Sequence, residues 1–377
     1  MKNNWQRKKL KDLVLYSKGR KPRNLGKKSF ERTIPYIDIK AFEKGIIRKY
    51  SDENNTNLTD GNDILIVWDG ARFGLSANKV KGAVGSTIMK LTPIDGVDPK
   101  YLSYFIKSKY RDIQNKPRGV GIPHVEPSLL WNFEMPTPNK DVQIEVAQKI
   151  DALFSKIDAG EENLKKVEKQ LEVYRQAVLK KAFENTGYKE VKLNDIVKQV
   201  KISFDPKKTK DEKVYIGLEH ISKGTGEILE YSSTSEVRSN KNVFNSGNIL
   251  YGKLRPYLSK VAIPNRNGVC STDILVFEAK FGINNELVKY LLLNRDFVSF
   301  ATDSSTGVQH PRTKWNIIKE YHFFIPKKIE EQQKLVSKIK SKFLLISKLH
   351  KDINNMVFRV DSLRQSILKK AFEGKLV

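Results

Sequence analysis

The feature that most constrains the fold is an internal repeat with a period of 189 residues. The segment RQAVLKKAFE at residues 175–184 recurs as RQSILKKAFE at residues 364–373, with eight of ten positions identical. QIEVAQKI at residues 143–150 recurs as QQKLVSKI at residues 332–339, at the same offset. Self-similarity at a fixed distance indicates two copies of one folding unit, arranged in tandem.

Weaker similarities continue through the segments that precede these repeats. Their offsets differ, from 180 to 186, which indicates insertions and a greater divergence of the globular parts. The matched pairs are KLKDLV (9–14) with KLNDIV (192–197), IPYIDI (34–39) with VYIGLE (214–219), GSTIM (85–89) with CSTDI (270–274), and GIPH (121–124) with GVQH (307–310).

Each copy begins with short β-rich runs, such as DILIVW at residues 63–68 and NILYGK at residues 248–253, broken by Gly, Asn and Pro. This pattern predicts an α+β domain. A proline-containing segment then marks the start of a long helix in each copy. The predicted division is a first globular domain at 1–138, a first helical spacer at 139–184, a second globular domain at 185–326 and a second helical spacer at 327–377.

The two helical segments carry apolar residues at intervals of seven, which predicts a coiled-coil seam. We expect the helices to pair in an antiparallel coiled coil between the globular domains, giving a pseudo-twofold arrangement. Two separate amphipathic helices, each packed on its own domain, are the alternative. The predicted a positions are Ile150, Ile157, Leu164, Leu171 and Val178, and Ile339, Ile346, Ile353, Val360 and Ile367; the predicted d positions are Leu153, Val167 and Tyr174, and Leu349, Met356 and Leu363.

Charge points to a polyanionic partner. Lysine and arginine number 69 against 43 aspartate and glutamate residues, a formal net charge of +26. Neutralising DNA phosphates releases condensed counterions, so such an excess favours nucleic-acid binding; a solvated lysine-rich surface is the alternative. The N-terminus lacks the apolar core of a signal peptide, and no apolar run approaches membrane-spanning length, so we expect a soluble cytoplasmic protein. The single cysteine, Cys270, excludes an internal disulfide and is expected to be a buried small side chain.

The motifs of several enzyme classes are missing from the sequence. It has no GxxxxGK[ST] phosphate loop, no GxGxxG after a strand, and no Pro-Pro of the kind expected in an amino-methylating DNA enzyme. Asp273, Glu278 and Lys280 resemble a nuclease carboxylate cluster, but the other copy lacks the pattern, which favours a strand with a polar edge. We therefore expect no catalytic residue, metal site or cofactor in this chain.

Three basic loops and two strand ends are candidates for DNA contact. The loops at residues 17–24, 116–119 and 205–210 mix basic residues with Gly or Pro, which suits phosphate contacts, although each can equally be a solvated loop. WDGARFG (68–74) and YGKLRPY (251–257) follow matching strands, where arginine can bond a guanine edge; an ion-paired arginine at the edge of the core is the alternative. His124 and His310 match in GIPHVEP and GVQHPRT, and either stabilise turns or touch DNA. The candidates are Lys18, Arg20, Lys21, Arg23, Trp68, Arg72, Arg118, His124, Lys207, Lys208, Lys210, Tyr251, Lys253, Arg255, Tyr257, His310, Arg312 and Lys314.

The whole chain resembles the specificity subunit of type I restriction-modification systems. The resemblance is carried, in order, by WQRKKLKDL (5–13), PYIDIK (35–40), DILIVWDGARFG (63–74), VQIEVAQKI (142–150), LKKAFE (179–184) and LKKAFEGKLV (368–377). It implies that each globular domain is a target recognition domain and that the helices are spacers that also bind the methyltransferase subunits.

The same resemblance implies partners. It places the chain with double-stranded DNA, two methyltransferase (modification) subunits and, in the restricting form, two motor-nuclease subunits, which would supply S-adenosylmethionine, ATP and magnesium. The divergence of the two domains implies a bipartite, asymmetric target, with half-site centres roughly one DNA turn apart. Two alternatives remain open: the recognition remnant of a fused DNA-modification enzyme, and a structural protein that binds DNA without sequence preference.

Overall fold

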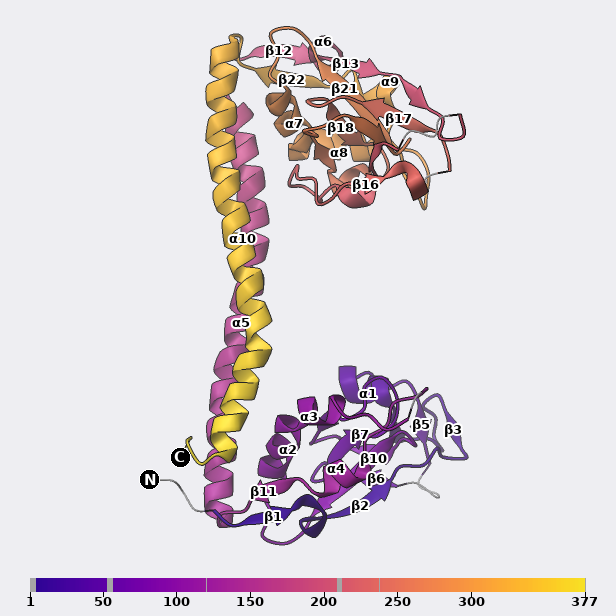
Figure 1. Cartoon of the computed structure of the whole chain (residues 1–377), viewed down its shortest axis with the longest axis vertical. Helices are drawn as coiled ribbons and strands as arrows, with labels where there is room; N and C mark the ends of the chain where they lie inside the picture. Colours follow the sequence, from indigo (N-terminus) through magenta and orange to yellow (C-terminus); the bar gives the residue numbers. More distant parts are fainter. Residues whose placement is uncertain (1–4, 53–56, 120, 209–211, 237, 377) are drawn as a thin grey trace. The chain divides into compact units, whose positions relative to one another are not determined.

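The computed structural model describes residues 5–52, 57–119, 121–208, 212–236 and 238–376. The chain forms two compact units: unit 1 comprises Met1–Leu164 and Asn355–Val377, and unit 2 comprises Lys165–Asn354. Two long helices, α5 (Lys140–Phe183) and α10 (Ile329–Phe372), each contribute to both units (Figure 1). Each unit is therefore built from one globular domain and one part of each helix; the division into four consecutive segments stays a prediction.

The globular domain of unit 1, domain 1, contains two sheets of different kinds. A four-stranded antiparallel sheet has the order β2-β10-β7-β8, a mixed sheet has the order β3-β5-β4-β9-β6, and β1 pairs with β11. Its strands are β1 (Arg7–Lys9), β2 (Val14–Lys18), β3 (Leu25–Gly26), β4 (Ile34–Ile37), β5 (Tyr50–Ser51), β6 (Leu58–Thr59), β7 (Ile64–Val67), β8 (Ser76–Ala77), β9 (Gly82–Val84), β10 (Ile88–Pro93) and β11 (Glu134–Pro136), and its helices are α1 (Ile39–Lys44), α2 (Pro99–Ser108), α3 (Tyr110–Gln114) and α4 (Pro127–Trp131).

The globular domain of unit 2, domain 2, repeats this plan. Its four-stranded sheet is β13-β21-β18-β19, its mixed sheet is β14-β17-β20-β15-β16, and β12 pairs with β22. Its strands are β12 (Lys189–Lys192), β13 (Val197–Val200), β14 (Ser203–Phe204), β15 (Val214–Ile216), β16 (Ser232–Ser233), β17 (Lys241–Phe244), β18 (Ile249–Gly252), β19 (Val261–Ala262), β20 (Gly268–Cys270), β21 (Ile274–Ala279) and β22 (His322–Ile325), and its helices are α6 (Leu193–Ile196), α7 (Asn285–Leu293), α8 (Arg295–Asp303) and α9 (Trp315–Ile318).

The two domains share one fold, which confirms the predicted tandem α+β architecture. In both mixed sheets, one parallel pair (β4 with β9, β15 with β20) sits among antiparallel neighbours. The domains differ in the edge strand that completes this sheet: β3 joins beside β5, whereas β14 joins beside β17 at the opposite edge. The repeat therefore fixes the central strands, while the edges diverged.

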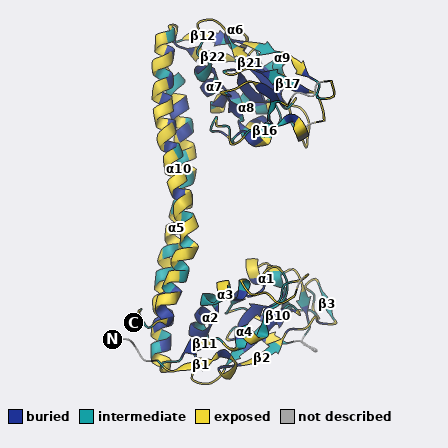
Figure 2. Cartoon of the chain, in the orientation of Figure 1, coloured by how far each residue is buried: buried dark blue, intermediate teal, exposed yellow. Residues whose placement is uncertain are grey.

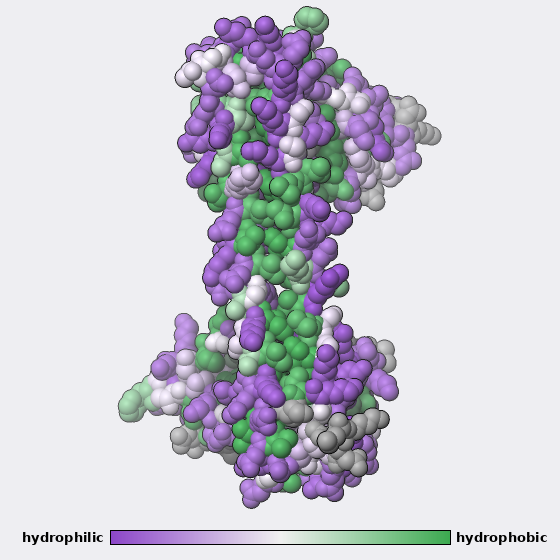
Figure 3. All heavy atoms as spheres, turned by 90° about the vertical axis from the view of Figure 1, so that its left-hand side faces the viewer, coloured by the Kyte–Doolittle hydropathy of each residue, from purple (hydrophilic) through white to green (hydrophobic). Residues whose placement is uncertain are grey.

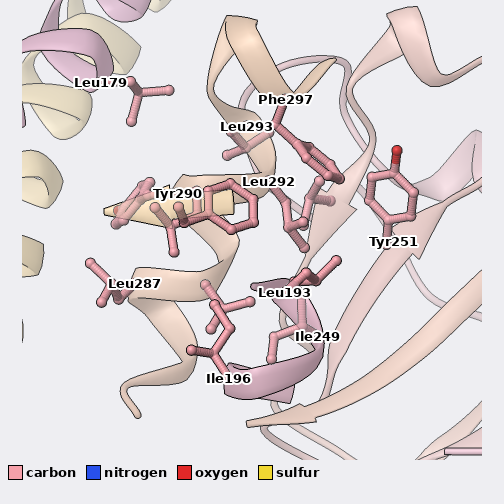
Figure 4. Close-up of a cluster of buried hydrophobic side chains, with 14 of the residues drawn as sticks. Leu179, Leu193, Ile196, Ile249, Tyr251, Leu287, Tyr290, Leu292, Leu293 and Phe297 are labelled. Carbon is pink, nitrogen blue, oxygen red and sulfur yellow. The ribbon is translucent and has the colours of Figure 1, made fainter. Parts of the chain in front are cut away.

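Each four-stranded sheet is covered by the helix that follows its longest strand. In domain 1 the fully buried Tyr101 and Phe105 of α2 belong to the same core as Ile64, Ile66 and Leu91 of the sheet. Buried parts of the chain are dark blue in Figure 2. In domain 2, α7 and α8 build the equivalent core with β18 and β21 (Figure 4). Such burial of large apolar side chains is the main stabilising contribution to each domain.

A buried glutamine joins each globular domain to its own long helix. The Gln143 amide accepts a hydrogen bond from the backbone N–H of Asp98 (3.0 Å) and donates to the carbonyls of Gly96 (3.0 Å) and Pro138 (2.8 Å). Gln332 makes the same three bonds in unit 2, with Asn284, Gly282 and Pro326. The amide thereby binds the turn before α2 or α7 to the chain that leads into the long helix.

The long helices pair with each other in both units, and this confirms the predicted antiparallel coiled coil. In unit 1 the start of α5 and the end of α10 share the core of domain 1; in unit 2 the end of α5 and the start of α10 share the core of domain 2. Phe372, in the repeated LKKAFE motif, packs edge-to-face against Tyr101 and Phe105. The strongest sequence repeat is thus an element that completes a globular core.

The predicted a positions are buried or half-buried, but the predicted d positions were wrong. Val167 and Tyr174 of α5 are 41% and 46% exposed, and Met356 and Leu363 of α10 are 53% and 51% exposed. Leu349 is likewise 41% exposed, and only Leu153 is half-buried. A repeat of seven residues defines the first seam column. It does not define whether the second seam column lies three or four residues after the first.

The second seam column lies four residues after each a position and mixes apolar side chains, such as Phe343 and Ala371, with polar ones. In unit 1 Arg364 of α10 lies 3.4 Å from Glu161 of α5. In unit 2 His350 lies 3.7 Å from Glu168, and the buried Arg175 side chain lies over the Phe343 ring at 5.6 Å. These residues lie one position after the expected d column, and polar pairs in a seam favour one register and orientation of the helices.

The amide bonds of the buried glutamines generate a first prediction. Gln143→Ala should leave one backbone N–H and two carbonyls without their partner, at a cost of about 1–3 kcal/mol in the stability of unit 1. Hydrogen exchange should show faster exchange of the Asp98 amide. Gln148→Ala, at an exposed position on the same helix, is the matched control. Equal exchange in both variants would show that the amide does not hold this turn.

Candidate nucleic-acid interface

A short hairpin follows the helices of each four-stranded sheet, and in domain 1 it is closed by Arg118 and His124, with residue 120 outside the described residues. Arg118 and His124 exchange two backbone hydrogen bonds, of 3.0 and 2.9 Å. The hairpin is bound to the exit of β7, because Gly70 donates to the Pro123 carbonyl (2.9 Å) and Val125 donates to the Trp68 carbonyl (2.9 Å). Main-chain hydrogen bonds thereby join the end of a strand to a distant loop, and we call this assembly the tip of the domain.

Domain 2 repeats this tip with a different alignment from the predicted one. Thr306 and Arg312 exchange the two hairpin bonds, Arg255 donates to the Pro311 carbonyl (2.7 Å), and Thr313 donates to the Lys253 carbonyl (3.0 Å). Matching bond for bond, GVGIPH (119–124) corresponds to GVQHPR (307–312). The expected match of His124 with His310 was therefore wrong by two residues, and the equivalent of His124 is Arg312.

The other sequence matches near the tip also shift. Strand pairing aligns Val84 with Cys270, one residue away from the match of GSTIM with CSTDI. Equivalent hydrogen bonds align Trp68 with Lys253, two residues away from the match of Trp68 with Tyr251. Short similar strings had been matched by residue type, whereas the backbone pairs them by strand register.

In domain 1 the carboxylate of Asp69 holds the side chain of His124. Asp69 lies at the exit of β7, and its two oxygens contact the His124 Nδ1 (2.7 Å) and the Lys18 Nζ (2.8 Å). The side chains of His124 and Lys18 are 39% and 48% exposed, while that of Asp69 is 19% exposed. The structure thus brings Lys18, Arg118 and His124 of the predicted set together.

In domain 2 the carboxylate of Asp273 holds the side chain of Arg312. The Arg312 guanidinium donates from Nε to Asp273 Oδ1 (2.8 Å) and from Nη2 to Oδ2 (3.0 Å), a bidentate pair. These bonds hold the pKa of the Asp273 carboxyl below its usual value, because they favour its ionised form. Lys253, Arg255, His310 and Arg312 are gathered at this tip, and the carbonyl of His310 accepts from Arg312 Nη1 (3.3 Å).

The aromatic candidates lie mostly in or near the core. Tyr251 is 2% exposed and packs against Phe277 and Phe297, so its prediction as a DNA-contacting residue was wrong (Figure 4). Trp68 is half-buried beside Trp131, with ring centroids 6.0 Å apart. Tyr257, on the 3-10 helix after Arg255, remains 48% exposed.

The remaining basic candidates are spread over exposed loops. Arg72 pairs with Glu43 at 3.0 Å, as in the alternative of an ion-paired arginine at the core edge. Lys314 is exposed at the start of α9, and Lys210 lies outside the described residues. Arg20, Lys21 and Arg23 follow β2, and Lys207 and Lys208 lie in a turn after β14; all five are exposed.

Cys270 is a buried residue of domain 2, as expected from the sequence. Burial raises the pKa of the Cys270 thiol to about 12, so this side chain is a protonated member of the domain 2 core. Within the described ranges, no cluster of three or more His, Cys, Asp or Glu side chains is arranged to hold a metal ion. Among the same residues, no helix has the length and apolarity needed to cross a membrane.

The comparison with known families decides the membership of this chain. The family model for the type I restriction modification DNA specificity domain matches twice, at residues 2–169 and 185–358. The chain belongs to this family. Each specificity domain therefore carries its own tip, closed by His124 in the first domain and by Arg312 in the second.

Individual relatives agree with this assignment. The chain is 25% identical over 320 residues to the type I restriction enzyme EcoDI specificity subunit of Escherichia coli, covering 74% of this chain and 70% of the relative. It is 25% identical over 402 residues to the MjaVIII specificity subunit of Methanocaldococcus jannaschii, covering 99% and 93%.

Solved structures share the fold of these specificity domains. One structure, described as the basis of complex assembly and conformational transition of the type I R-M system, matches with a TM-score of 0.76 at 16% identity, covering 99% of this chain and 98% of the other. The HsdS subunit from Thermoanaerobacter tengcongensis matches with a TM-score of 0.60 at 15% identity, covering 99% and 97%.

Asp69 and Asp273 were missed as members of the tips. Asp69 lies inside the WDGARFG motif, and Asp273 belongs to the residues that resemble a nuclease carboxylate cluster. The sequence signal that could have found them is the shared spacing of Gly and Pro in GVGIPH and GVQHPR. This spacing aligns His124 with Arg312, two basic side chains for which a carboxylate partner can then be sought.

The backbone of the tip generates a second prediction. Gly119 has φ +90°, and a Cβ there would lie 3.0 Å from the Ile122 carbonyl oxygen. Gly119→Ala should cost roughly 1–3 kcal/mol of local stability and loosen the hairpin. Gly121→Ala, where a Cβ meets nothing within 4 Å, is the control. Faster exchange of the His124 amide in the first variant only is expected; equal protection in both would refute the strained position.

Proposed function

We propose that this specificity subunit of a type I restriction-modification system reads a bipartite, asymmetric DNA target, one half-site with each specificity domain. The observation that carries the proposal is a pair of tips with one backbone and different side chains. His124 and Lys18 occupy the first tip, and Arg312, Lys253 and Arg255 the second. Equivalent scaffolds that present different donors suit two different sequences.

We further propose that this chain recognises the DNA target and that partner subunits carry out the catalytic reactions. Specificity-domain matches extend over residues 2–169 and 185–358, and these ranges take in both tips and most of both long helices. S-adenosylmethionine, ATP and magnesium would then be bound by methyltransferase and motor-nuclease subunits. The excess of positive charge on the chain supports a role in holding DNA for them.

The exposed apolar stripe of the long helices supports docking of a methyltransferase subunit. Val167 and Tyr174 repeat at seven on α5, and Leu349, Met356 and Leu363 repeat at seven on α10, all outside the seam. In the surface view, hydrophobic side chains line the paired helices of each unit between hydrophilic borders (Figure 3). A heptad stripe suits a further helix, and exposed apolar patches commonly mark protein interfaces.

A groove in unit 2 adds to this surface. It encloses about 510 Å³ between the end of α5 and the start of α10, and Tyr174, Val178, Leu335 and Ile339 are among the residues that line it. Its apolar walls continue from the stripe, so an apolar side chain of a docked helix would bury area on both sides.

The target prediction is tested by sequencing methylated bases in host DNA with the gene present and deleted. Deletion should remove one bipartite motif with a fixed gap, since both half-sites depend on one chain. An unchanged set of methylated motifs, with the partner subunits verified as expressed, would refute the proposed function. Methylation lost without any sequence preference would favour a structural DNA-binding protein.

The docking prediction uses charge on the stripe. Met356→Glu should reduce co-purification of the methyltransferase subunit, because the carboxylate would be buried against an apolar partner surface. The thermal melting of the chain should stay unchanged, since Met356 is exposed. Asn354→Glu, exposed on the same helix, should retain the partner. By contrast, Ile346→Glu in the seam should lower the melting temperature; normal co-purification with Met356→Glu would refute the docking surface.

A further inference from the structure

We propose that His124 and Arg312 are equivalent base-reading residues of the two specificity domains, that Asp69 and Asp273 position them, and that Arg312 reads a guanine. The inference rests on the proposed function, because it assigns the residues that would distinguish one half-site from another.

The first support is the identical backbone around the two side chains. Positions 124 and 312 each close a hairpin through a pair of backbone bonds, and each follows a proline whose carbonyl accepts from the exit of the central strand, β7 or β18. The hairpins turn at Gly119 and Gly307, with φ of +90° and +105°. Each side chain therefore leaves a backbone that is fixed on both sides.

The second support is that the two domains reach one arrangement by different residues. By the equivalent hydrogen bonds, the domain 2 counterpart of Asp69 is Leu254, and the domain 1 counterpart of Asp273 is Thr87. The two carboxylates thus come from different strands of the same fold and still hold positions 124 and 312. A retained ancestral ion pair would use the same positions. The shared element is a nitrogen-bearing side chain held by a carboxylate.

The third support is the chemistry of the held groups. Asp273 accepts from the Nε and Nη2 donors of Arg312, while Nη1 donates to the His310 carbonyl at 3.3 Å. The guanidinium keeps further N–H donors in a fixed plane, and its side chain is 44% exposed. Such a fork matches the O6 and N7 acceptors of guanine. His124 has its Nδ1 against Asp69, which leaves Nε2 as the ring nitrogen that can meet a base.

The carboxylates also separate base reading from phosphate contact. A negative oxygen beside Arg312 offsets much of its attraction for phosphate, but it leaves the direction of the N–H donors intact. Lys253 and Arg255 at the same tip, and Lys207 and Lys208 in the exposed turn after β14, have charges that can neutralise phosphates. Arg312 is the basic side chain of this tip whose orientation is fixed by two bonds.

The test uses the chain in complex with its methyltransferase subunits and duplexes in which each base of the methylated motif is replaced in turn. Arg312→Lys keeps the charge and loses the fork. It should reduce the preference for guanine at one position of one half-site by roughly five- to hundred-fold, with affinity for a random duplex unchanged. Asp273→Asn should weaken the same single preference without changing thermal melting, and the double variant should lose no more than Arg312→Lys alone.

Domain 1 provides the matched control. Asp69→Asn should leave that guanine preference intact and alter a position in the other half-site. A uniform loss of affinity for every duplex with Arg312→Lys would show a phosphate contact and overturn the inference, as would a preference for another base at the affected position. If the wild-type complex has a defined motif and Arg312→Lys does not change it, the inference is refuted and the proposed function stands. If the wild-type complex has no sequence preference, the proposed function is refuted as well.

Discussion

The structure depends on one buried amide in each unit. Gln143 and Gln332 stand at the start of the long helices, and each binds the turn before α2 or α7 to the proline that precedes the helix. The same turn provides the N-cap of the following helix, Asp98 or Asn284. A side chain with two donors and an acceptor can satisfy three backbone groups that would otherwise be buried without partners. Sheet, covering helix and spacer are therefore held in one geometry within each unit.

The long helices have two apolar stripes with different tasks. One stripe forms the seam, where isoleucines and leucines alternate with polar side chains such as Glu161, Arg364 and Arg175. Polar pairs in a seam cost stability, but they penalise other registers. The second set of apolar side chains, with Tyr174 in unit 2 and Met356 in unit 1, is left exposed. Exposed apolar surface of this kind is unfavourable in water for an isolated chain. A partner helix that covered it in the proposed assembly would explain why it is there.

The two tips show how a recognition fold can diverge without losing its frame. Backbone bonds, glycine turns and the proline are common to both, whereas the side chains and even the strands that supply the carboxylates differ. Since the frame depends on main-chain hydrogen bonds, side chains at the tip are free to change with little effect on stability. Under the proposed function, this separation lets one frame present different base-contacting side chains in the two domains.

The sequence by itself determined the duplication, the α+β class, the two long helices and the residues of the first seam column, because these depend on periodicity and on repeated strings. It also pointed to Gln143, Gln332 and the LKKAFE motif as repeated, without showing what they hold. Only the tertiary structure decided which heptad column is buried, that Tyr251 is a core residue, and that His124 corresponds to Arg312 rather than His310. The physical reason is that a spacing of seven leaves the second column undefined, and that strand register and carboxylate pairing join residues far apart in the chain, whose partners no local pattern names.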